Sequence, residues 1–206
     1  MKHLRTACLL LVLSFAIASL AQGTGQSASP TPAPQAQAAP QPAPTFASIV
    51  DRQVSQYEKL MVDAAEAMPE DKFNFTPESL NIKGGEFKAV RTFAQLIKHT
   101  ATANFRNWSA LAGEKMPDNI KGPNGPDELK TKAEIIQFLK DSFAVGHRAA
   151  KALTADNILE MVSTGRGASP RLALATGTVI HCGDEYGQMV EYLRMNGITP
   201  PASAGR

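Results

Sequence analysis

SPRLALATGTVIHCGDEYGQMVEYLRMNGITPP, residues 169–201, is the stretch that decides the fold. Ser169 predicts an N-cap, and Pro170 suits the first helical position, where no backbone donor is needed. Gly197 can adopt the left-handed conformation that ends a helix, and the prolines at 200 and 201 prevent its continuation. Roughly 27 residues lie between these signals, which predicts a helix about 40 Å long.

One face of this predicted helix is built from six residues at spacings of three and four: Leu174, Thr178, His181, Glu185, Met189 and Tyr192. Because Leu, Met and Tyr favour the interior, we expect this face to be buried, with His181 and Glu185 in its middle. Side chains four residues apart lie about 6 Å apart along the helix axis, which is close enough for both to hold one ion.

The rest of the chain predicts three more helices and no sheet. Apolar residues keep a helical period over residues 45–68 and 91–111, with Thr92 as an N-cap, and a third helix starts at Thr131 with a capping box completed by Glu134. The connections are long and irregular, with a short helical turn expected at residues 156–162. No stretch alternates Val and Ile as strands do. The predicted fold is therefore all-α, an up-down-type four-helix bundle with long crossing connections.

The first residues predict export. Residues 1–21 have a basic start, an apolar run and a small-x-small cleavage site, so we interpret them as a signal peptide, with a retained membrane anchor as the alternative. Residues 22–44 carry six prolines and no charge, which indicates a disordered tether. The folded domain is then residues 45–206. The expected location is periplasmic or secreted, with no membrane contact after cleavage.

Charge argues against nucleic acid as a partner. The chain has 21 Lys plus Arg and 19 Asp plus Glu. Cleavage removes Lys2 and Arg5 and no acid, so the mature chain has 21 − 2 = 19 basic residues against 19 acidic residues. A nucleic-acid footprint needs a basic excess or stripe, which this sequence lacks.

Cysteine use predicts no disulfide. Cys8 lies in the predicted signal peptide, which leaves Cys182 alone in the mature chain. Cys182 is rotated about 100° from the face of His181, so we expect a buried small residue and not a reactive thiol.

His147 stands beside Arg148 with no second acid or histidine at ligand spacing, and we expect it to be exposed or partly packed.

The burial of a charge is the physical basis of a metal hypothesis. Glu185 on an apolar face loses hydration, which is costly unless a cation or hydrogen bonds replace it. His99 lies on the inner side of the helix predicted at residues 91–111, and facing helices of a bundle often supply ligands together. Two imidazoles and a carboxylate would bind one divalent ion and leave positions open. The alternatives are a core histidine at position 99 and a simple ion pair between His181 and Glu185.

Three segments carry a resemblance to a known family: VRTFAQLIKHTATANF at residues 90–105, MPEDKFNFTP at residues 68–77 and HCGDEYGQMVEYLRMNGITPPAS at residues 181–203. Over residues 45–203 the chain resembles the DinB-like (damage-inducible B) four-helix metal-binding family. The resemblance implies one divalent metal, held by a histidine of the second helix and an H-x-x-x-H pair of the fourth. His99 and His181 match that pattern.

The third family position departs from the pattern, because Glu185 replaces a histidine. A carboxylate is a harder ligand, so the change either alters the metal preference or marks a site that has lost its metal. Zinc is the expected metal, with nickel, iron and manganese as alternatives. The register favours Glu185 over Asp184 as the ligand, because the fourth residue after His181 stays on its face.

The resemblance implies thiol-dependent transferases and isomerases, but export disfavours their cytosolic thiols as co-substrates. The expected reaction is therefore hydrolysis of an unknown small molecule by a metal-activated water, while enzyme activity itself stays open. Gln188 and Tyr192 either orient a substrate or pack. The alternative function is a non-catalytic exported bundle that binds a partner or forms the homodimer that the resemblance implies. Gly183 and Gly187 would permit close approach of another helix, within the bundle or across a dimer.

Overall fold

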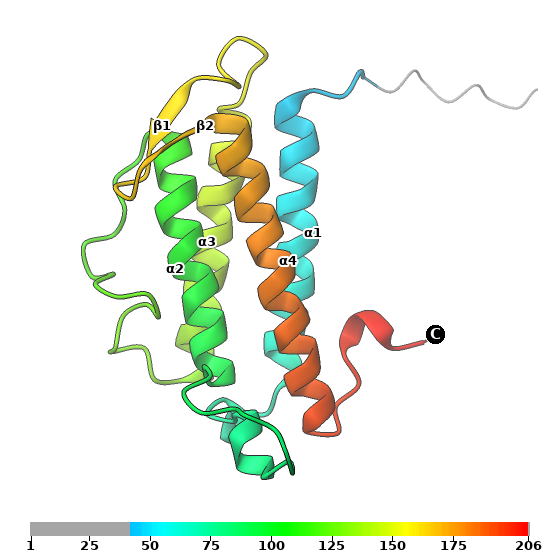
Figure 1. Ribbon diagram of the computed structural model, residues 1–206. Helices are drawn as coiled ribbons and strands as arrows, with labels where there is room; N and C mark the ends of the chain where they lie inside the picture. Colours follow the sequence, from blue (N-terminus) through cyan, green and yellow to red (C-terminus); the bar gives the residue numbers. More distant parts are fainter. Residues whose placement is uncertain (1–41, 206) are drawn as a thin grey trace, which may run out of the picture. The chain divides into compact units, whose positions relative to one another are not determined.

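The computed structural model describes residues 42–205, so the predicted signal peptide and most of the predicted tether lie outside the described residues. The described chain is mainly helical (Figure 1), as the sequence predicts. Its elements are four long helices, two short strands and three 3₁₀ turns: α1 (Phe46–Ala67), η1 (Glu70–Lys72), η2 (Pro77–Leu80), α2 (Phe93–Ala112), α3 (Lys132–Lys151), β1 (Met161–Ser163), β2 (Ala168–Pro170), α4 (Arg171–Met195) and η3 (Pro201–Ser203).

The four helices pack as a bundle in which α1 and α2 each contact both α3 and α4. Lys132 Nζ, at the start of α3, donates a hydrogen bond to the Met68 carbonyl at the end of α1, at 2.8 Å. At the other end of α3, Arg148 Nε donates to Glu114, just after α2, at 2.7 Å. Helices α2 and α3 therefore run parallel, and residues 113–131 cross the length of the bundle between them (Figure 1). None of the helices in residues 42–205 is long and apolar enough to cross a membrane.

Local side-chain chemistry fixes the starts of three helices. Thr45, Thr92 and Thr131 each cap their helix, and each forms a capping box with the residue three positions on. Each box satisfies backbone donors that a helix start leaves without partners. The N-caps predicted at Thr92 and Thr131 are thus confirmed.

The start of α4 differs from the prediction. Ser169 does not cap the helix, because it lies in β2, where it pairs with Val162 of β1 in an antiparallel hairpin. Gly165 and Gly167 have positive φ angles and form the turn of this hairpin. The helical turn predicted at residues 156–162 therefore extends too far, because residues 161 and 162 belong to β1. Three paired residues are too few to give the alternating pattern by which strands are recognised.

The end of α4 follows the prediction. Gly197 has φ 72°, in the left-handed region. The Gly197 N–H donates to the Arg194 carbonyl, and the Ile198 N–H donates to the Leu193 carbonyl, both at 2.9 Å. This is the Schellman pattern, in which a left-handed residue satisfies the last carbonyls of a helix.

Gly146 of α3 allows α1, α2 and α3 to approach one another closely, because it has no side chain. A Cβ atom on Gly146 of α3 would lie 3.2 Å from Val54 Cγ1 on α1 and 3.2 Å from Trp108 Nε1 on α2. Gly183 has a similar role on α4, where a Cβ atom would lie 2.8 Å from the hydroxyl of Tyr57 on α1. The close approach at Gly183 is therefore used within the bundle.

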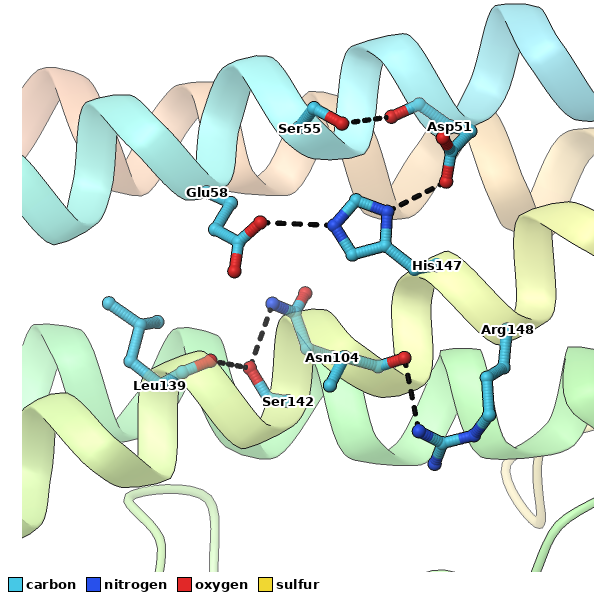
Figure 2. A network of polar contacts seen from close by, with 9 residues as sticks. Asp51, Ser55, Glu58, Asn104, Leu139, Ser142, His147 and Arg148 are labelled. Carbon is cyan, nitrogen blue, oxygen red and sulfur yellow. Dashed lines mark hydrogen bonds and ion pairs between the residues drawn. The ribbon is translucent and has the colours of Figure 1, made fainter.

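Polar contacts link the helices in the middle of the bundle. His147 on α3 lies between two acids of α1, with Nδ1 2.7 Å from Asp51 and Nε2 3.0 Å from Glu58 (Figure 2). Deeper in the core, Asn104 Nδ2 of α2 donates to Ser142 of α3 at 3.2 Å, and Cys182 Sγ of α4 donates to Asn104 Oδ1 at 3.3 Å. His147 is partly packed, as predicted. Its two acidic partners were not predicted, because they come from another helix.

Candidate metal centre

The antiparallel packing of α2 against α4 brings together His99, His181 and Glu185. Each offers one ligand atom, and these atoms all lie within 4.8 Å of one another. Glu185 Oε1 lies 3.7 Å from His99 Nε2 and 3.9 Å from His181 Nδ1. The two imidazole rings meet edge to face, with centroids 5.3 Å apart. The three residues that the sequence analysis singled out therefore converge on one point of the bundle.

The carboxylate is the buried part of this group. Glu185 is 3% exposed, and its Oε2 atom has no hydrogen-bond partner among the described residues. The side chains of His99 and His181 are 19% and 28% exposed. The group is thus open to solvent on the imidazole side and closed behind the carboxylate. A buried carboxylate oxygen without a partner is costly, so Glu185 is a group that a cation would stabilise.

The protonation states suit metal ligands. Burial lowers the pKa of His99 and of His181, which favours the neutral imidazoles that a metal needs. Burial also raises the pKa of Glu185 from 4.5 to about 7. In the absence of a cation, the buried carboxyl group therefore holds a proton more readily than an exposed glutamate does.

A loop of the crossing connection orients one imidazole. Nδ1 of His99 lies 2.8 Å from the Pro123 carbonyl oxygen. Because a carbonyl only accepts hydrogen bonds, Nδ1 carries the proton, which leaves the lone pair of Nε2 directed toward Glu185. Metal-bound histidines usually have such a partner on the second ring nitrogen, and it fixes both the tautomer and the ring.

The spacing of the donor atoms fits a divalent ion. Tetrahedral zinc, with bonds of about 2.0–2.1 Å to nitrogen and oxygen, places its ligand atoms roughly 3.3 Å from one another. The carboxylate–imidazole separations of 3.7 Å and 3.9 Å are close to this value, and all the ligand atoms lie within 4.8 Å of one another, so the ligands need to draw together by about 1.5 Å at most. Asp184 is exposed and lies outside the group.

Three residues beside the group have different roles. Tyr192 is buried, and its hydroxyl donates to the Arg91 carbonyl at 2.9 Å. Of its two predicted roles, orienting a substrate or packing, Tyr192 therefore has the packing role. Gln188 instead lines a hollow of about 420 Å³ beside the group. Arg91 lines the same hollow and was not predicted as a site residue from the sequence. Its position directly before the Thr92 cap was the only local signal.

The chain matches the model of a known protein family. A family model described as the DinB superfamily matches residues 53–189, which span most of α1 to α4 and include all three residues of the candidate centre. A search of curated proteins found no significant match.

Proposed function

Because this chain belongs to the DinB superfamily, we propose that it binds one divalent metal ion through His99, His181 and Glu185 and acts as a metal-dependent hydrolase. The observation that carries the proposal is the buried carboxylate of Glu185: its Oε2 atom has no hydrogen-bond partner among residues 42–205, and its Oε1 atom lies beside two imidazoles whose neutral forms are favoured. Zinc is the metal we propose, since two imidazoles and one carboxylate are common zinc ligands.

Three protein ligands leave coordination positions for water and substrate. A bound divalent cation would supply Lewis-acid chemistry there, polarising a carbonyl or lowering the pKa of water. The residues of the chain orient and shield the ligands. The Pro123 carbonyl orients the His99 ring, and the packing of α2 against α4 excludes water from the buried side of Glu185. Transfer to a thiol is the alternative reaction at the same centre.

Export and self-association are further parts of the proposal. Residues 1–21 support export through their basic start, apolar run and cleavage site. Mass spectrometry of the protein from the periplasm or medium would show whether cleavage follows Ala21. Homodimer formation rests on the family resemblance, and sedimentation of the purified protein tests it.

Metal analysis tests the proposed centre. We expect the purified protein, loaded with zinc and desalted, to retain one equivalent of zinc. His99→Ala and His181→Ala should each lose it. His147→Ala is the matched control, because it removes a half-buried histidine that lies between Asp51 and Glu58 and outside the centre. A wild-type protein that retains no divalent metal would overturn the proposal and would favour the non-catalytic binding module.

A second variant tests the departure from the family pattern. Glu185→His restores the histidine that the resemblance implies. If Glu185 is a working ligand, both proteins bind metal, and the variant shifts preference toward softer metals, because imidazole is softer than carboxylate. Metal binding by the Glu185→His variant alone would mean that the natural chain has a degenerate site.

A further inference from the structure

A hollow lies about one helical turn from the candidate metal centre. Its volume is about 420 Å³, within the usual size of small-molecule sites. Gln95 stands one helical turn before His99 on α2, and Gln188 stands about one turn after Glu185 on α4. The hollow therefore lies where α2 and α4 meet, next to the centre along both helices. Its lining residues are Ala89, Val90, Arg91, Gln95, Asn124 and Gln188.

Arg91 is the charged residue of this lining. Its Nε atom donates to Asn124 Oδ1 at 3.0 Å, which fixes the guanidinium plane. No acid among residues 42–205 forms an ion pair with it. Two acids lie near the lining without forming an ion pair with Arg91: Glu185 interacts electrostatically with Arg91, and Asp184 accepts a hydrogen bond from Gln188 at 3.4 Å. With Nε committed to Asn124, the two terminal nitrogens of Arg91 remain for a bidentate contact, the geometry that matches a carboxylate.

The backbone N–H groups at the N-terminus of α2 are not available to bind an anion in the hollow. The backbone N–H groups of Phe93 and Ala94 donate to the carbonyls of Phe75 and Phe73, at 3.1 Å and 2.8 Å. The next N–H donates to the Thr92 cap. The first donors of the helix are therefore occupied, and recognition of a negative group in the hollow falls to Arg91.

Charges of both signs lie along α2 and α4. The charge of Arg91 acts on His99, His181 and Glu185, and the charge of Arg106 acts on His99 from two turns further along α2. Asp184 acts on His181 and Glu185 with the opposite sign. The lining of the hollow itself contains Arg91 and no acid, which favours an anionic ligand there.

We propose that the substrate is a small carboxylate-bearing molecule, whose carboxylate binds Arg91 in this hollow while its reacting group lies at the metal centre. This inference rests on the proposed function, since it names the substrate class of the same site. Arg91 is a specificity-determining residue in this arrangement, and Gln95 and Gln188 lie beside it as amide partners for polar parts of the same molecule.

Calorimetric titration with two probes tests the inference. Benzoate carries the carboxylate, and benzamide is its neutral counterpart of nearly equal shape. We expect the zinc-loaded protein to bind benzoate, and Arg91→Gln to weaken that binding by about tenfold to a hundredfold, as loss of a charge-assisted bidentate contact does. Arg91→Lys should fall between the two, and benzamide should respond to neither change. Lys121→Gln is the control for long-range charge, because it removes an exposed cation of residues 113–131, the connection that also carries Asn124.

The outcomes separate this inference from the proposed function. Zinc content and the melting temperature are measured for every variant, so a folding defect of Arg91→Gln is recognised, and Arg91→Lys then decides the question. If the protein binds one equivalent of zinc but the Arg91 variants bind benzoate as tightly as the wild type, the inference is overturned and the metal centre stands. If the protein binds no zinc but binds benzoate through Arg91, the hydrolase proposal fails and the anion site stands. Equal weakening for benzoate and benzamide would also overturn the inference.

Discussion

Nδ1 of His147 on α3 lies 2.7 Å from Oδ1 of Asp51 on α1, while the opposite ring nitrogen contacts a second acid of the same helix (Figure 2). A ring bridged by two carboxylates is stabilised in its doubly protonated form. Burial lowers the pKa of His147, but the hydrogen bonds to Glu58 and Asp51 outweigh it, so the pKa is raised above 6.5. The contact is therefore a charged link between α1 and α3.

This link predicts a pH-dependent stability. Because the pKa of His147 is raised by folding, its contribution is complete below 6.5 and is lost as the pH rises through the raised value. We expect His147→Gln to cost about 1 kcal/mol at about pH 6 and much less at about pH 9. Urea unfolding at both pH values measures the difference. A cost that does not change between them would mean that the ring packs without being charged.

Glu185 gives a prediction of the same direction for the metal-free protein. Folding raises its pKa from 4.5 to about 7, so the metal-free fold loses stability as the pH rises between those values. In chelator at about pH 8, Glu185→Gln should be more stable than the wild type by about 2 kcal/mol, since it removes a buried charge. With zinc the order should reverse, because only the wild type gains binding energy. Thermal melts in chelator and in zinc measure both. A wild type that is already the more stable protein in chelator would contradict the prediction.

Local signals in the sequence predicted most of the fold. Thr92 and Thr131 cap helices through contacts within four residues of themselves, so their roles follow from the sequence. The prediction failed at Ser169, whose pairing with Val162 in a short hairpin overrides its capping preference. Short strands depend on the partner strand and turn, and three residues are too few to show a period.

The candidate site divides in the same way. His181 and Glu185 share a helix face, so their proximity follows from their spacing, and His99 was reached through the bundle hypothesis. Arg91 could not be assigned, because its surroundings are set by Asn124 of the crossing connection. A loop of this length has no regular pattern that fixes its path from sequence.

Cys182 provides a test of the core. It is 1% exposed, and burial raises its pKa to about 12. Because the thiolate is the reactive form, we expect no labelling by iodoacetamide in the native protein at about pH 8 and complete labelling in denaturant. Mass spectrometry of both samples measures this. Rapid labelling of the native protein would contradict the predicted buried, unreactive thiol.

A glycine within α4 and a glycine just after its end should respond in opposite ways to the same substitution. Gly197 ends the helix with φ 72°, where a side chain is strained, so Gly197→Ala should cost about 1 kcal/mol. Gly177 lies within the helix, and a Cβ atom there would meet nothing within 4 Å. Gly177→Ala should therefore stabilise the protein by roughly 0.5–1 kcal/mol, since alanine loses less chain entropy than glycine in a helix. Urea unfolding of both variants measures the difference. A destabilising Gly177→Ala would mean that another surface covers this side of α4, and a neutral Gly197→Ala would mean that the helix end refolds without the left-handed residue.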